Sequence, residues 1–195
     1  MSAATQTALP AWSQRLISAL DAADQCFETL AKGLTTEQLN WRPAAEAWSI
    51  GQCLQHLHIT NEVYLPAISV ALEGQPRFQV EEIKPGWFGR WFIRTFIDSS
   101  GKRRTRAPKK INPGPRVEPS VLDSLLRSNQ AARELIARAG HYDVNRIRFR
   151  NPFISGIRFT VGTGLEIVSK HQSRHLLQAE RVKESVAFPE RQRQE

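Results

Sequence analysis

Two histidines near the end of the chain have the spacing of a metal-binding pair. His171 and His175 are four residues apart, and on an α-helix that spacing places both imidazoles on one face, one turn apart. Zinc–nitrogen bonds are about 2.0–2.1 Å long, so both rings can reach a single ion. Histidines at this spacing are also common on ordinary helices, and a metal site therefore needs a further ligand from elsewhere in the chain.

Several side chains are candidates for that third ligand. His56 and His58 lie in another segment with helical periodicity, and the periodicity does not choose between them. Cys53, three residues before His56, is a softer alternative, although a small buried core residue is the more ordinary interpretation. His141 follows Gly140, which predicts a helix end, so we expect His141 in a solvated loop. The residues alone leave the third ligand open.

Four long stretches have the apolar spacing of amphipathic helices, which would have to position these histidines. They run over about 11–32, from 49 until Gly74 and Pro76 mark the end, over about 119–139 and over about 165–185. The residues between the last two form an irregular segment with short apolar alternation at Ile147, Phe149, Ile157, Phe159 and Val161. The pattern predicts an all-α protein, a four-helix bundle that forms one domain over 1–195.

Local signals predict where the second helix begins and where it bends. Ser49 and Gln52 have the spacing of a capping box. Pro66, inside the same helix, removes one backbone hydrogen bond and predicts a kink. Thr35 or Thr36 is expected to cap a short helical turn before it.

The connection over about 76–119 is long, rich in proline and basic. From residue 77 to 116 the sequence has 11 Lys or Arg and 3 Asp or Glu, so this segment carries the whole net charge of +8. It also contains an aromatic patch, which consists of Trp87, Phe88, Trp91, Phe92, Ile93, Phe96 and Ile97. This patch predicts a short helix that packs on the bundle, with Trp87 and Phe88 turned inward. Connections of this length are often functional in compact domains. The predicted helices contain no nucleic-acid recognition motif, so nucleic acid is not an expected partner.

Targeting signals and cysteines indicate the compartment. The first ten residues lack the basic start and apolar core of a signal peptide. No stretch approaches the ~20 apolar residues of a membrane-spanning helix. Cys26 and Cys53 are too few for a disulfide framework. We therefore expect a cytoplasmic protein with reduced thiols and no transmembrane segment.

Two segments resemble the DinB-like superfamily. The first reads WRP and then WSIGQCLQHL over residues 41–57, and the second reads HQSRHLLQ over residues 171–178. In that family a histidine eight residues after the tryptophan of the WS pair joins an H-x-x-x-H pair in a three-histidine metal site. Eight residues after Trp48 is His56, so the resemblance implies His56, His171 and His175 as the ligands. It covers about residues 12–183, and the basic segment matches least.

The resemblance also implies a fold and a chemistry. The fold is a four-helix bundle with a long crossover connection between helices 2 and 3, often assembled as a homodimer. The site is open on one side and holds one divalent metal ion, and three imidazoles suit zinc, nickel, iron or manganese. Characterised relatives include thiol-dependent transferases and isomerases that use bacillithiol or mycothiol, in which the metal lowers the pKa of the thiol.

The leading hypothesis is a metal-dependent, thiol S-transferase-like enzyme. It would act on a low-molecular-weight thiol and a small-molecule substrate, with the thiolate as the nucleophile. In this interpretation the basic segment closes over the site and binds an anionic group. The residues that could contact such a group are Arg104, Arg106, Lys109 and Lys110.

Two alternatives remain. A metal-dependent hydrolase would need a general base, and Glu62 lies six residues after His56, far around the helix. A non-catalytic binding module would use the basic 77–116 segment on an acidic partner. Trp87 and Trp91, beside basic residues, would then lie at a membrane interface or stack on single-stranded nucleic acid.

Three histidines also predict a pH dependence of metal binding. Imidazole binds a metal only when it is neutral, so protons compete with the ion. With an ordinary pKa of about 6.5 for each ring, we expect metal occupancy to fall steeply between about pH 6 and pH 5.

Overall fold

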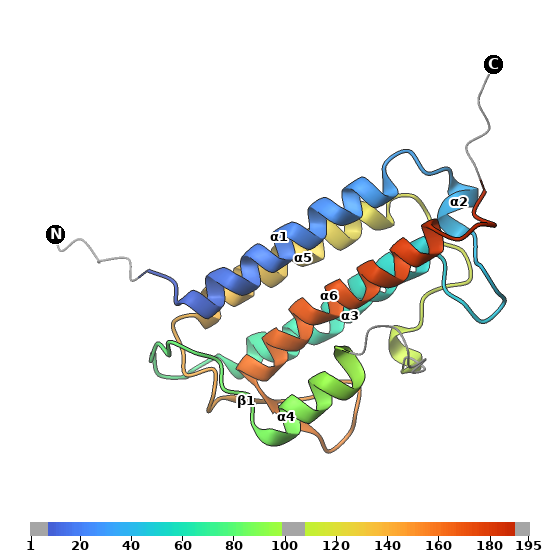
Figure 1. The fold of residues 1–195 in the computed structure, drawn as a ribbon. Coiled ribbons are helices and arrows are strands. Elements are labelled where there is room, and N and C mark those ends of the chain that lie inside the picture. The colour runs from blue at the N-terminus through green and yellow to red at the C-terminus, as the bar shows by residue number, and fades with distance from the viewer. Residues whose placement is uncertain (1–7, 99–107, 190–195) are drawn as a thin grey trace.

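Four long helices form the body of the protein, as the sequence predicts (Figure 1). The computed structural model describes residues 8–98 and 108–189. The long helices are α1 (Ala11–Ala31), α3 (Ile50–Ala71), α5 (Val121–Ala139) and α6 (Val161–Lys183). The shorter elements are the helices α2 (Thr36–Asn40) and α4 (Trp87–Phe92), the π-helical turn η1 (Ile93–Ile97), the 3-10 turn η2 (Lys109–Ile111), and the strands β1 (Arg148–Arg150) and β2 (Arg158–Thr160). The all-α four-helix prediction is confirmed.

The direction of the helices explains the long crossover. Helices α1 and α3 each pack against both α5 and α6. Arg138 and Ser69 lie near the C-terminal ends of α5 and α3, and the Arg138 guanidinium donates to the Ser69 carbonyl at 2.7 Å. Because the two C-terminal ends meet, these neighbouring helices run in parallel. Since α3 is 22 residues long, or about 33 Å, the chain must return along the whole bundle before α5 begins. The segment between α3 and α5 makes that return (Figure 1).

The returning segment contributes to the apolar core. Ile93, Ile97, Ile111 and Val117 are all buried. The first two join a cluster with the ends of α3 and α5, and Val117 joins a second cluster around Phe27 of α1. The connection is therefore anchored at several points by hydrophobic contacts.

Side-chain caps mark the starts of α2, α3 and α6. The Ser49 hydroxyl accepts from the Gln52 amide at 3.1 Å, and the Gln52 side chain accepts from the Ser49 amide at 3.1 Å, which confirms the predicted capping box. Thr35 caps α2 in the same way. Helix α3 continues through Pro66. Helix α6 begins at Val161, earlier than the predicted start at residue 165, because the Thr160 hydroxyl caps it.

The irregular segment before α6 contains a small antiparallel hairpin. Phe149 of β1 lies opposite Phe159 of β2, and both rings are buried. Phe149 packs so closely on α6 that a Cβ at Gly164 would lie 2.6 Å from its ring. The apolar alternation therefore marked real strands, and a glycine in α6 provides the space for them.

The aromatic patch forms a helix that packs on this hairpin. The Phe88 ring stacks on Phe159 with ring centroids 5.8 Å apart, as expected for a helix on the bundle. The inward orientation expected for Trp87 is wrong, because this side chain is 77% exposed. With Phe88 turned inward, its neighbour lies about 100° away around the helix and faces solvent.

A buried polar network joins the four long helices. The Asn129 amide of α5 donates to Asp24 of α1 at 2.6 Å, and its oxygen accepts from Asn61 of α3 at 2.8 Å and from Gln172 of α6 at 2.9 Å. Arg133 neutralises Asp24 at 2.7 Å. Each of these hydrogen bonds can form only when its helix has one position along and around its own axis. The network therefore fixes the position of Gln172, the residue after His171.

Each cysteine lies in a long helix, Cys26 in α1 and Cys53 in α3. Cys26 is exposed, Cys53 is buried, and both are free thiols. Within residues 8–98 and 108–189, no helix combines the length and the apolar character needed to cross a bilayer.

Candidate metal centre

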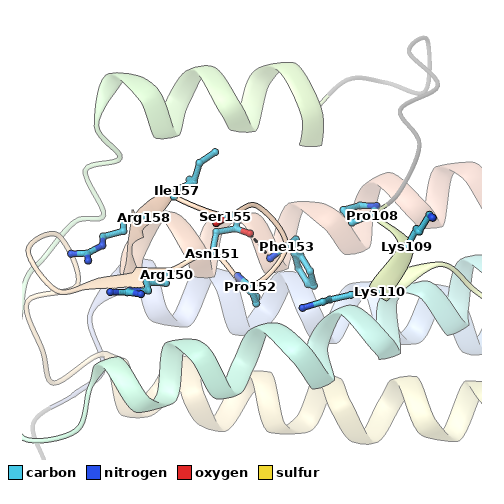
Figure 2. A pocket seen from close by; sticks show the side chains of 11 residues that line it. Pro108, Lys109, Lys110, Arg150, Asn151, Pro152, Phe153, Ser155, Ile157 and Arg158 are labelled. Atoms are coloured by element: carbon cyan, nitrogen blue, oxygen red, sulfur yellow. Dashed lines mark hydrogen bonds between the residues drawn. The ribbon is translucent and has the colours of Figure 1, made fainter.

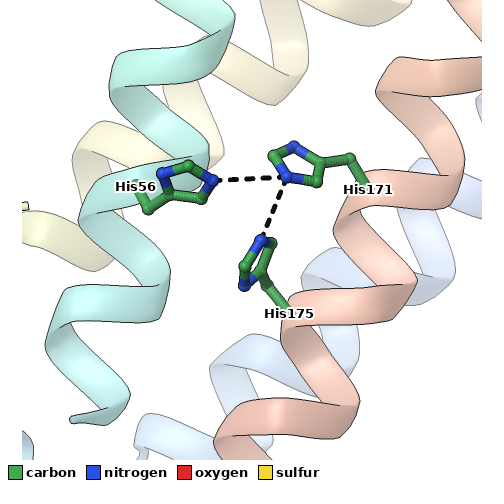
Figure 3. Close-up of side chains that lie close together, drawn as sticks. All are labelled: His56, His171 and His175. Carbon is green, nitrogen blue, oxygen red and sulfur yellow. Dashed lines mark hydrogen bonds between the residues drawn. The ribbon is translucent and has the colours of Figure 1, made fainter. Parts of the chain in front are cut away.

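Three histidine side chains from two helices meet at one point (Figure 3). His56 projects from α3, and His171 and His175 project from successive turns of α6. The His171 Nε2 atom lies 3.3 Å from Nε2 of His56 and 3.0 Å from Nε2 of His175. The structure thus brings together the three residues that the family resemblance implies.

Hydrogen bonds fix the tautomer of two of these rings. Nδ1 of His56 lies 2.7 Å from the Ile111 carbonyl, and Nδ1 of His175 lies 3.0 Å from the Gln178 side-chain oxygen. These oxygens only accept, so each Nδ1 carries the proton and donates it. The Nε2 lone pairs of both rings therefore face the centre, the arrangement found in metal-binding histidines.

The geometry fits a divalent ion. Tetrahedral bonds of about 2.0–2.1 Å place neighbouring nitrogens about 3.3–3.4 Å apart. Two of the three nitrogen pairs lie close to this value, at 3.0 and 3.3 Å, and all three nitrogens lie within 4.8 Å of one another. A neutral His171 ring has at most one proton on Nε2, which can point to only one of the two facing lone pairs. The other facing lone pair is left buried without a proton donor, and a cation between the rings would satisfy it.

Burial keeps all three rings neutral. It lowers the pKa of His56 to about 4, with a smaller contribution from the positive charge of Arg174. Burial also lowers the pKa values of His171 and His175 well below 6.5, and the neighbouring rings and Arg174 add to this effect. Neutral imidazole is the form that binds metals, so the site is prepared for an ion at neutral pH.

Trp48 forms a wall of the site. Its ring stacks on His175 with centroids 5.6 Å apart and lies 4.8 Å from the His56 ring, tilted. It is half-buried and immediately precedes Ser49, the cap of α3. Within one motif, therefore, Trp48 covers the histidines and Ser49 fixes the helix that bears His56.

The other candidate ligands lie outside this cluster. Cys53 is part of the apolar core, where burial raises the pKa of its thiol and keeps it protonated. His58 and His141 are half-buried and are not part of the group. Among the described residues, no carboxylate joins the three histidines, and Glu62 is exposed.

The basic segment is only partly described. Lys109 and Lys110 are exposed and immediately precede Ile111, whose carbonyl accepts from His56. Arg104 and Arg106 lie outside the described residues.

Four contributors to the site have no role in the sequence prediction. Trp48 stood in the recognised motif, but only as a landmark. Gln178 follows His175 by three residues, a spacing that could have suggested a partner one helical turn away. Arg174 lies between the two histidines and acts through its charge. Ile111 acts through its backbone carbonyl, which no side-chain pattern reveals.

Comparison with known proteins identifies the family. The model of the DinB superfamily matches residues 19–179, and the chain belongs to this superfamily. It is 27% identical over 165 residues to the uncharacterized protein YuaE of Bacillus subtilis (strain 168), an alignment that covers 80% of this chain and 89% of that protein. No solved structure matches the chain. Family membership and the three-histidine cluster together are compatible with a metal-dependent enzyme.

Removal of any one of the three histidines should abolish tight metal binding. We expect His56→Ala, His171→Ala and His175→Ala each to lower metal affinity by about a hundredfold or more, since loss of even an indirect partner costs 10–100-fold. His58→Ala and His141→Ala are matched controls that should retain the wild-type metal content. The measurement is elemental analysis of protein purified without a nickel column. Full metal occupancy in any of the first three variants would show that the substituted histidine is not a ligand.

The lowered pKa values move the expected pH dependence to more acidic conditions. In the unfolded chain a histidine has a pKa of about 6.5, whereas His56 in the folded protein has a pKa of about 4. Protons therefore compete with the metal at His56 only near pH 4, and the pKa values of His171 and His175 are lowered in the same direction. We expect metal to be retained at pH 5 and lost steeply as the pH approaches 4.

The same shifts predict the stability of the metal-free protein. Between about pH 6.5 and 4 the unfolded chain binds more protons than the folded protein, so the free energy of unfolding should fall as the pH falls through this range. Metal retained after dialysis and circular dichroism at each pH test both statements. Metal loss with a midpoint above pH 6, or with the slope of a single proton, would contradict the three-histidine site.

Proposed function

We propose that this protein is a metal-dependent enzyme of the thiol S-transferase type, with His56, His171 and His175 as the metal ligands. The observation that carries the proposal is the convergence of three neutral imidazole Nε2 atoms, two of them oriented by hydrogen bonds to Nδ1. Catalytic zinc sites have three protein ligands and one open position, whereas structural sites are closed by four. A divalent ion held here would lower the pKa of a thiol co-substrate and supply its thiolate at neutral pH.

The protein groups around the histidines suit an anionic reactant. The positive charge of Arg174 acts on all three rings, and the same charge stabilises a thiolate relative to a thiol. Trp48 excludes water from one side of the rings and thereby strengthens these electrostatic interactions.

Hydrolysis has less support than thiol transfer. A metal-dependent hydrolase needs a base that accepts a proton from water, and within the described chain no Asp or Glu belongs to the cluster. Glu62, the carboxylate that the sequence offered for this role, is exposed. A thiol has a much lower intrinsic pKa than water, so its activation depends less on such a base.

A thiol-dependent assay tests the proposal. Protein incubated with a panel of low-molecular-weight thiols and an activated aryl halide should form the thioether with at least one thiol. A chelator should abolish the reaction, a divalent metal should restore it, and His171→Ala should reduce it by about a hundredfold or more. His141→Ala is the matched control. Chelator-resistant transfer, or metal-dependent ester hydrolysis without transfer from any thiol, would overturn the assignment.

One surface favours a second candidate, a module that binds an anionic membrane. Trp87, Arg90, Trp91 and Arg94 are all exposed and have the spacing of one helical face. Tryptophans with interspersed arginines suit the interface of an acidic bilayer, where the rings enter the headgroup region and the guanidinium groups meet phosphates.

Vesicle binding tests this second candidate. Full-length protein should bind vesicles that contain phosphatidylglycerol, and the double variant Trp87→Ala/Trp91→Ala should bind about tenfold less, because it loses two interfacial rings. Phe78→Ala is the matched control, since Phe78 is also an exposed aromatic side chain (62%) but lies outside this face. Equal loss in the control, or no binding by the wild type, would eliminate the candidate.

A further inference from the structure

A cavity of about 770 Å³ lies between the hairpin and η2 (Figure 2). The facing ends of β1 and β2 and most of the turn between them, residues 150–153 and 155–158, form one wall, and residues 108–110 form the other. The volume lies within the range of about 300–1,000 Å³ that is usual for small-molecule sites. Its size therefore suits a small ligand.

The cavity is strongly basic. Lys109, Lys110, Arg150 and Arg158 line it, and the other described residues of its lining are all neutral. In the part of the chain that the structure describes, no ion pair involves any of these four cations. Four uncompensated positive charges around one cavity favour a ligand with more than one negative charge.

Two of the arginines are held in an unfavourable arrangement. Arg150 and Arg158 lie directly opposite each other across the β1–β2 ladder, and Figure 2 shows their side chains extending to the same side. Like charges in such a pair destabilise a sheet. Because the buried Phe149–Phe159 pair fixes the register, neither arginine can move to the other face. An anion between the two guanidinium groups would turn this repulsion into attraction.

The cavity shares structural elements with the histidine cluster. Lys109 and Lys110 belong to η2, and the third residue of η2, Ile111, accepts the hydrogen bond from Nδ1 of His56 at 2.7 Å. On the other wall, the Phe153 ring stacks on Tyr64 of α3 with centroids 5.7 Å apart. Helix α3 also bears His56, about 12 Å further along it, so the η2 wall contacts a histidine directly and the hairpin wall contacts the helix that bears it.

We propose that this cavity binds the acidic end, a set of carboxylate or phosphate groups, of the molecule that reacts at the histidine site. The pair Arg150 and Arg158, whose side chains extend away from Lys110 in Figure 2, is the principal anion contact, and Lys110 contributes only through its charge. Anion binding itself does not depend on the metal. That the anion is part of the reacting molecule rests on the proposed function.

Calorimetry with pyrophosphate and citrate tests the site and separates phosphate from carboxylate chemistry. Full-length wild-type protein should bind at least one of them at low ionic strength. The variant Arg150→Gln/Arg158→Gln should bind it about tenfold or more weakly, since it loses two charge-assisted contacts, and Lys110→Gln should show a smaller loss. Arg148→Gln is the matched control, because Arg148 is exposed on the same strand but lies opposite Thr160 and does not line the cavity. It should bind within about twofold of the wild type.

Thermal unfolding provides an independent readout that also checks folding. Without an anion, Arg158→Gln should melt at a higher temperature than the wild type, because the cross-strand repulsion is gone. Pyrophosphate or citrate should raise the melting temperature of the wild type and of Arg148→Gln but not of the double variant. Equal weakening by Arg148→Gln would show general surface charge instead of a built site. Absence of binding by the wild type would overturn the inference.

Two further measurements distinguish this inference from the proposed function. Anion binding should persist in His171→Ala, and its loss there would contradict an independent anion site. If the wild type binds pyrophosphate or citrate but no metal, the proposed function fails and the anion site stands. If metal-dependent thiol transfer occurs and Arg150→Gln/Arg158→Gln leaves every KM unchanged, the proposed function stands and the assignment of the cavity to the reactant fails.

Discussion

The burial of three imidazole rings between α3 and α6 is the constraint on which the rest of the site depends. Each ring has two nitrogens, and a buried nitrogen without a partner is unfavourable. Ile111 and Gln178 satisfy the outer nitrogens of His56 and His175. The inner nitrogens face one another, and burial with mutual repulsion keeps all three rings neutral. A cation bound between three neutral donors at these distances would stabilise them together.

The topology of the bundle supplies one of those partners. Because α3 and α5 run in parallel, the chain between them must return along the bundle, and the returning segment passes the N-terminal half of α3. There Ile111 is buried and its carbonyl orients His56. The same three-residue turn places Lys109 and Lys110 at the basic cavity. The crossover is thus both the connection that the fold requires and a wall of the site.

The sequence was sufficient for the parts of the structure that depend on periodicity and capping. The four helices, the capping box at Ser49 and the association of His56 with His171 and His175 all follow from local patterns or from the family motif. What it did not reveal depends on tertiary contacts. The exposure of Trp87 depends on which neighbouring ring meets the hairpin. The opposed arginines of the hairpin appear only once the strand register is known.

The electrostatics of the site favour an anionic partner over a neutral one. A divalent ion held by three neutral imidazoles would keep its positive charge uncompensated by ligands, because none of the described carboxylates joins the cluster. Arg174 adds a further positive charge, which already acts on all three rings. Inside a bundle of low dielectric these charges repel one another more strongly than they would in water. A thiolate would compensate the positive charge at the histidine site, and acidic groups would compensate the charge of the basic cavity. One molecule that carries both groups, or two molecules bound side by side, could therefore neutralise the whole region.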